Sequence, residues 1–273
     1  MDFYFKCTVA VGAGPQAGQY SWSSTSNWYN VSGVALGALP TATDNVFFNS
    51  ASATSTQVVT LQTASRPCLN LDMTGFAGSI SGGNGGLIQV FGTSVILTSN
   101  SSVGIFALST LPTLLIYSGT TTYIKTNGQT LGAVSIANTS TLIPIDDFIS
   151  FSNCILAIEQ GTFNANNKNV SIGGFSAGTT LASKTLTMGS GKWTLGGEGP
   201  PNGPFYVWNV PSGTAPYFTL NAGTQSIRLV RFGGASALND TLLSTKTTGD
   251  TIAIHGAIVQ GSSTTTWNTT GTV

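Results

Sequence analysis

The sequence predicts an all-β protein, with a β-solenoid body similar to a parallel β-helix and a β-sandwich or jelly roll as the alternative. Three observations lead to this prediction. The strand-favouring residues Thr, Val and Ile are abundant, and 34 Gly residues suit tight turns. Only 7% of the 273 residues are charged, against about 25% in an ordinary domain. No long segment carries a 3.6-residue apolar stripe, so no long helix is expected.

A rhythm of short β segments separated by Gly, Asn and Ser turns begins near residue 55. Three similar units, at 127–136, 167–174 and 220–230, each place an Asn or Gly turn before an alternating strand. We expect coils of about 20–25 residues. Uncharged Thr, Ser and Asn favour the solenoid over the sandwich, because stacked charges along its axis would repel. The expected strands are 57–61, 68–73, 87–91, 94–98, 113–117, 121–125, 133–136, 154–158, 169–172, 186–188, 192–195, 217–220, 226–230 and 251–254.

The chain divides into four expected parts. Residues 1–54 form an aromatic-capped β element, beginning with a strand in which Phe3 and Phe5 alternate with other residues. Residues 55–195 form the repetitive body, and 217–273 carry further β repeats. Between them, 196–216 is rich in Gly and Pro and predicts a surface excursion. It carries Phe205, Tyr206 and Trp208, the aromatic residues that we expect to be presented to a binding partner.

The most distinctive segment lies between residues 20 and 50. It reads Trp-x4-Asn-Trp (Trp22, Asn27, Trp28), then a Gly-containing loop, then Pro-x3-Asp-Asn-Val-Phe-Phe (Pro40, Asp44, Asn45, Phe47, Phe48). Two tryptophans six residues apart suit the cap of an open apolar stack. The Asp-Asn pair suits the turn that begins the strand 46–48.

This segment resembles an element of long, Thr/Gly-rich virion proteins of tailed bacteriophages, such as tail fibre and other structural proteins. Those proteins also combine a Trp-x4-Asn/Arg-Trp element, a Gly loop and Pro-x3-Asp-Asn-Val-Phe-Phe with a repetitive β-rich body. The specific part covers about 30 residues, while the body matches in style only. The resemblance implies a virion role and self-association into a homotrimer, and it carries over no catalytic residue.

Residues that could carry catalysis are few. Among nine acidic residues, the best candidate group for glycan cleavage by paired carboxylates is Asp146, Asp147 and Glu159. The turn signal of Pro144 favours a simple turn role for the first two. His255 is the single histidine, and no Gly-x-Ser-x-Gly elbow accompanies it. We therefore predict a protein that is not an enzyme.

Other site chemistry also finds little support in the sequence. Cys7, Cys68 and Cys154 are too widely spaced for a metal or redox motif. We expect them to be small buried residues, and a disulfide between two of them is the alternative. The Gly-rich stretches lack the pattern of a phosphate loop or a calcium repeat. We expect no metal and no cofactor. A net charge of zero and scattered basic residues argue against nucleic-acid binding.

The sequence therefore favours a virion structural protein of the tail fibre, spike or baseplate. Its expected partners are other virion proteins, further copies of itself and a host surface glycan. The first residues lack a secretory signal and no run is long enough for a membrane span, so we expect assembly in the host cytoplasm. The alternatives are a capsid decoration protein, a polysaccharide depolymerase and a bacterial adhesin fragment. The low-complexity end, without a capping helix, predicts a covering partner or a longer chain.

Overall fold

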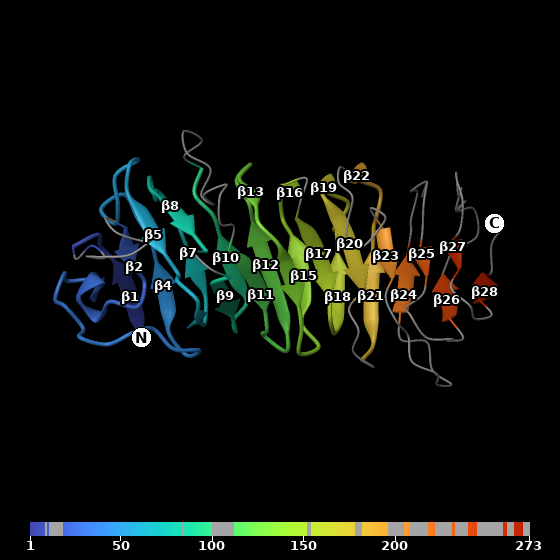
Figure 1. Cartoon of the computed structure of the whole chain (residues 1–273), viewed down its shortest axis with the longest axis horizontal. Coiled ribbons are helices and arrows are strands. Elements are labelled where there is room, and N and C mark those ends of the chain that lie inside the picture. The colour runs from blue at the N-terminus through green and yellow to red at the C-terminus, as the bar shows by residue number, and fades with distance from the viewer. Residues whose placement is uncertain are drawn as a thin grey trace.

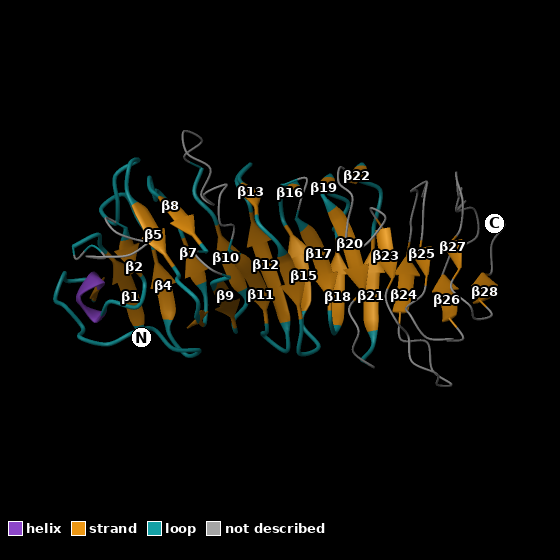
Figure 2. Ribbon diagram, viewed as in Figure 1, coloured by secondary structure: helices purple, strands orange, loops and turns teal. Residues whose placement is uncertain are grey.

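The structure is a computed structural model that describes residues 1–8, 10, 19–82, 85–99, 112–151, 154–177 and 182–195. It also describes the strand segments 205–207, 218–221, 231–232, 240–244, 259–260 and 265–269. Within these residues the chain is a β-solenoid whose strands follow one another along the long axis (Figure 1). The one helical element of the described residues is a single 3-10 turn, η1 (Thr25–Asn27), near the N-terminal end (Figure 2).

Two long parallel sheets run along the solenoid. Sheet 1 contains, in spatial order, β3 (Trp28–Tyr29), β1 (Asp2–Phe5), β4 (Asn45–Phe47), β7 (Leu71–Asp72), β10 (Ser94–Ile96), β12 (Thr121–Lys125), β15 (Thr141–Pro144), β18 (Gly161–Asn164), β21 (Lys184–Thr187), β24 (Phe218–Asn221), β26 (Asp240–Ser244) and β28 (Thr265–Thr269). Sheet 2 contains β6 (Ser65–Cys68), β9 (Leu87–Val90), β11 (Thr113–Ile116), β14 (Val134–Ile136), β17 (Ile155–Ile158), β20 (Gly174–Ala177), β23 (Phe205–Val207), β25 (Arg231–Phe232) and β27 (Val259–Gln260).

A third face is shared by two shorter sheets. Sheet 3 contains β13 (Thr130–Leu131), β16 (Phe148–Ser150), β19 (Val170–Ile172) and β22 (Trp193–Leu195). Sheet 4 contains β2 (Tyr20–Ser21), β5 (Val58–Thr60) and β8 (Ser79–Ser81). From β4 to β23 the chain visits sheet 1, then sheet 4 or 3, then sheet 2, except that no described strand of the third face lies between β10 and β11. This order makes each coil roughly triangular.

The predicted solenoid is confirmed, and the sandwich alternative is wrong. All strand pairs of the described residues are parallel except the β1–β3 pair at the N-terminal end. Hairpins cannot produce parallel neighbours, so each strand must return through a whole coil before it pairs again. The coil spacing is 25 residues from Val46 to Leu71 and 21 from Leu142 to Phe163. It rises to 34 between Leu186 and Leu220, beyond the expected 20–25.

The core consists of apolar ladders that face the axis. Inner residues alternate with outer ones along each strand, as the period of two requires. In sheet 2 one such ladder joins fully buried residues of successive coils in register, namely Ile88, Leu114, Val134, Leu156 and Phe175. Each coil therefore buries its apolar side chains against its two neighbours, which is the packing expected of a stacked repeat.

Asparagines make several of the corners. Asn127, Asn138 and Asn166 have positive φ angles of 51°, 56° and 52°. Asparagine tolerates this left-handed conformation better than most residues. The side-chain amides of these asparagines also donate hydrogen bonds to carbonyls of the preceding coil, at Leu97 (2.6 Å), Tyr117 (3.4 Å) and Pro144 (3.2 Å) respectively. The Asn turns that the sequence showed before 130–136 and 170–172 therefore both bend the chain and tie coils together.

The expected strands agree with the observed strands in part. The expected strand 121–125 is observed with the same bounds, and 57–61, 87–91, 94–98 and 113–117 each contain a strand. The range 68–73 contains the last residue of β6, a corner at 69–70 and the whole of β7. The prediction omitted several strands that are short or contain Gly, Ser or Pro, among them β8, β13, β15, β16, β18 and β20. It also omitted β2, β3, β23 and the C-terminal strands β25 to β28. The expected strands 226–230 and 251–254 lie outside the described residues.

We expect Ile136→Ala to destabilise the solenoid strongly. Ile136 is fully buried in the inner ladder of sheet 2, and removing a large buried side chain typically costs about 2–5 kcal/mol. Urea unfolding followed by circular dichroism measures this loss. Leu115→Ala is the matched control, because Leu115 lies half-buried on the outer face of the same sheet. Equal losses for the two variants would contradict the inward assignment of Ile136.

Candidate functional site

The N-terminal end of the core is a cluster of aromatic rings. Trp22, Trp28 and Phe48 are at most 1% exposed. The Trp22 and Trp28 ring centroids lie 5.1 Å apart at 65°, and Trp22 lies 5.4 Å from Phe48. Phe5 of β1 packs edge-on against Trp28 at 4.9 Å. These residues belong to the core at the first coils, and none of the three presents a ring to a ligand.

The polar members of the Trp-x4-Asn-Trp element hold this cluster in place. The Trp28 indole Nε1–H donates to the Trp22 carbonyl at 2.7 Å. The Asn27 side chain, also fully buried, donates to the Ser21 carbonyl at 3.0 Å and accepts from the Thr8 hydroxyl at 2.8 Å. Because a buried polar group must be satisfied to avoid a large desolvation cost, these bonds fix the loop geometry. The motif is a structural element at the end of the solenoid.

The second half of the motif builds the turn before β4. Pro40 is buried, and the Asp44 carboxylate accepts hydrogen bonds from the Thr41 backbone N–H (3.0 Å) and hydroxyl (2.6 Å). The N-terminal ammonium of Met1 lies 2.8 Å from Asp44. Burial acts to raise the pKa of Asp44, but the hydrogen bonds from the ammonium and Thr41, and the ammonium charge, hold it below its ordinary value. The expected turn role of Asp44 matches this geometry.

Asn45 begins a chain of side-chain hydrogen bonds along sheet 1. Its amide donates to Asp2 at 2.9 Å and accepts from the Asn70 amide at 2.9 Å. The Asn70 carbonyl oxygen in turn accepts from the backbone N–H groups of Thr93 and Ser94, both at 2.9 Å. Successive coils are therefore connected by a polar ladder on their outer edge, and Asn70 has little freedom to reorient.

The three candidate catalytic carboxylates do not share one corner of the coil. Asp146 and Asp147 lie between β15 of sheet 1 and β16 of sheet 3, whereas Glu159 lies between β17 of sheet 2 and β18 of sheet 1. Asp146 accepts from the Thr126 and Asn127 backbone N–H groups at 2.7 and 2.6 Å. Asp147 accepts from the Asn169 backbone and side-chain amides, each at 3.1 Å. Both acids thus cap the neighbouring coil, as the turn interpretation expected.

Glu159 lies near the buried amine of Lys184. Burial lowers the pKa of the Lys184 ammonium, and the negative charge of Glu159 partly opposes this effect. Glu159 therefore acts through its charge on Lys184, close to the corner between β17 and β18. The shared groove that the depolymerase hypothesis requires is not formed by these three residues.

The aromatic binding candidates of the Gly/Pro-rich range are only partly described. Phe205 and Tyr206 lie in β23, in register with Phe175 and Ser176 of β20. The chain is therefore strand at 205–207, within the range 196–216 expected to be a surface excursion. Trp208 lies outside the described residues, as does His255.

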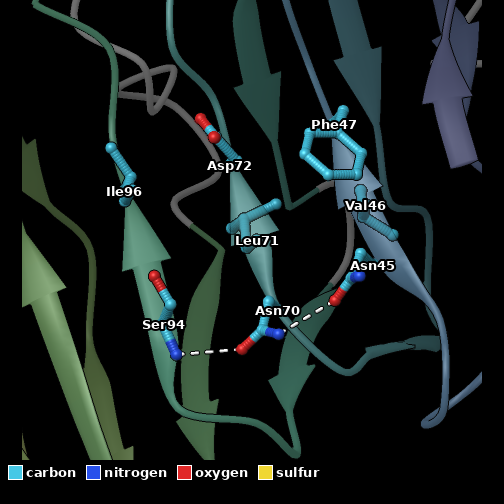
Figure 3. A pocket seen from close by; sticks show the side chains of 8 residues that line it. All are labelled: Asn45, Val46, Phe47, Asn70, Leu71, Asp72, Ser94 and Ile96. Atoms are coloured by element: carbon cyan, nitrogen blue, oxygen red, sulfur yellow. Dashed lines mark hydrogen bonds between the residues drawn. The ribbon is translucent and has the colours of Figure 1, made fainter. Parts of the chain in front are cut away.

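A shallow hollow on the outer face of sheet 1 is the site that the sequence did not indicate. Its volume is about 220 Å³, and it is lined by Asn45, Val46, Phe47, Asn70, Leu71, Asp72, Ser94 and Ile96 (Figure 3). It forms because β7 and β10 present the short side chains Asn70, Asp72 and Ser94 to the outside. Taller side chains rise on either side, namely Phe47 on β4 and the 49% exposed Tyr123 on β12.

The remaining candidates for chemistry are structural in the described residues. Cys7, Cys68 and Cys154 form no disulfide with one another. Burial raises the pKa of the Cys7 and Cys68 thiols to about 12, so these two thiols are poor nucleophiles. In the part of the chain that the structure describes, no group of three or more His, Cys, Asp or Glu side chains could hold a metal ion.

No described helix has the length and apolar character needed to cross a membrane.

The fold and site define the chain as a parallel β-solenoid protein. No family model, no curated protein and no solved structure matches the sequence.

We expect Asp146→Ala to lower stability by about 1–3 kcal/mol, because it leaves the two backbone N–H groups of residues 126 and 127 without their acceptor. Thermal and urea unfolding measure the loss. Asp147→Ala is the control and should lose less, since Asp147 is exposed and water can replace it. A stable Asp146→Ala protein would contradict the corner role.

The stability difference between the wild type and Asp44→Asn should depend on pH. Since the pKa of Asp44 is lowered in the folded state, its contribution is present above the unfolded pKa and disappears as pH falls through the folded pKa. We expect the variant to be less stable by about 1–2 kcal/mol at pH 7, with the gap closing below about pH 4. Urea unfolding across this range measures it, and a gap independent of pH would refute the assignment.

Proposed function

We propose that this chain is a non-enzymatic structural component of a bacteriophage particle, in a tail fibre, spike or baseplate. The observation that carries the proposal is the parallel stack of sheet 1, whose eleven described strands from β1 to β28 span about 48 Å at the usual spacing between strands. Such a stack is a stiff rod, since every coil is hydrogen-bonded to the next through backbone ladders. A rod of this kind suits a part that holds or extends other components.

The use of the ionisable side chains supports the same proposal. Asp44, Asp146 and Asp147 accept backbone hydrogen bonds at corners, so they stabilise turns rather than face a substrate. The sequence element from Trp22 to Phe48, which resembles that of tailed-phage virion proteins, is built here as the end of the rod. Under this proposal the partners of the protein are other virion proteins and two further copies of the chain, with a host surface glycan as the external ligand.

The location of the chain in particles tests this proposal. We expect antibodies against the recombinant protein to label the tail of purified particles of the virus that encodes it, seen by immunogold electron microscopy, and mass spectrometry to detect the chain in them. Antibody pre-absorbed with the recombinant protein is the control. Label on the head would favour a capsid decoration protein instead. Absence of the chain from purified particles would refute the virion role.

A further inference from the structure

The hollow on the outer face of sheet 1 has one flat apolar wall. Tyr4 and Phe47 are in register on β1 and β4, and their rings stack at 4.7 Å with 13° between the planes. This separation equals the distance between neighbouring strands, so the rings stack along the axis of the solenoid. One face of Phe47 is therefore covered by Tyr4, and the other faces the β7 side, where the hollow lies (Figure 3).

The floor of the hollow offers hydrogen-bonding atoms that the protein itself leaves free. Asp72 accepts from the Thr74 backbone N–H with Oδ1 at 2.8 Å, and its Oδ2 has no partner among the described residues. The Ser94 hydroxyl, on the neighbouring strand β10, likewise has none there. Asn70 is different, since its amide is held by Asn45, Thr93 and Ser94. The floor is thus rigid at Asn70 and open for bonding at Asp72 and Ser94.

These features together select the chemistry of a ligand. An aromatic face complements a flat C–H surface, a free carboxylate oxygen accepts from hydroxyl groups, and a serine hydroxyl both donates and accepts. A pyranose ring carries all three matching features. The volume of about 220 Å³ is below the ~300–1,000 Å³ of ordinary small-molecule pockets, so it suits one ring of a longer chain that continues over the surface.

We infer that the outer face of sheet 1 binds a neutral glycan, with one sugar ring stacked on Phe47 and hydrogen-bonded to Asp72 and Ser94. Tyr123 lies three strands from Phe47 and two residues along the strand, about 16 Å away. It provides a second aromatic surface for a further sugar of the same chain. This inference rests on the proposed function for its biological setting, where the ligand is the host glycan. It places the contact on the rod's side, away from the aromatic residues near 205–208 that the sequence suggested.

Binding by the isolated full-length chain tests the inference. The probes are an array of neutral oligosaccharides, followed by saturation-transfer NMR with the methyl pyranosides of glucose, galactose, mannose and N-acetylglucosamine. We expect binding that falls about tenfold or more in Asp72→Asn and Ser94→Ala, since each removes a hydrogen bond to the sugar, and in Phe47→Ala. Circular dichroism melting checks that each variant is folded. Should Phe47→Ala fail to fold, the other two variants still test the site.

Ser135→Ala is the matched control for Ser94→Ala, because Ser135 is a similarly half-buried outer-face serine, on sheet 2. It should bind as the wild type does. No binding to any glycan of the set, or equal binding by all variants, would overturn the inference. So would preferential binding of tetramethylammonium, which would make the hollow a cation site. These outcomes are independent of particle labelling, so loss of the virion role and loss of the glycan site can be told apart.

Discussion

The constraint on which this structure depends is the in-register stacking of parallel strands from coil to coil. A parallel neighbour is available only after a complete turn of the chain. Every coil must therefore bring its strands back into the same register, with the same side chains pointing toward the axis. The buried ladder from Ile88 through Leu114 and Val134 to Leu156 exists because each coil supplies an apolar side chain at the same register position. A shift of one residue in any strand would turn that side chain outward.

Stacking also explains why charged residues are scarce and what Asp146 and Asp147 bind. Like charges at equivalent positions of successive coils would lie about 5 Å apart, whereas amides and hydroxyls at that distance can bond to one another. The ladder from Asp2 through Asn45 to Asn70 shows this arrangement. Asp146 and Asp147 lie at a corner, where each bonds to an adjacent coil. The contacts that stabilise the rod therefore use the oxygens of these two carboxylates.

The regular stack also sets where a ligand can bind. A repeat with uniform outer residues would give a flat face. Hollows and ridges form only where the outer residues of successive coils differ in size. On sheet 1 the coils around β7 and β10 carry short polar residues between Phe47 and Tyr123, and the hollow follows from that difference. Its floor is ordered by backbone ladders on both sides, so ligand contacts made by Asp72 and Ser94 would come from a preorganised surface.

The fold class could be predicted from the residues alone, because strand alternation, Asn/Gly turns and low charge are local properties that the stack repeats. The sequence also placed the corner roles of Asp44 and Asp146 and the structural use of Trp22 and Trp28. It could not reveal strands such as β8 or β16, which are held by neighbours rather than by their own composition. Nor could it show the hollow, since Phe47, Asp72 and Ser94 come from different coils and become adjacent only through the register. That register depends on the length of each coil, which only the tertiary structure decides.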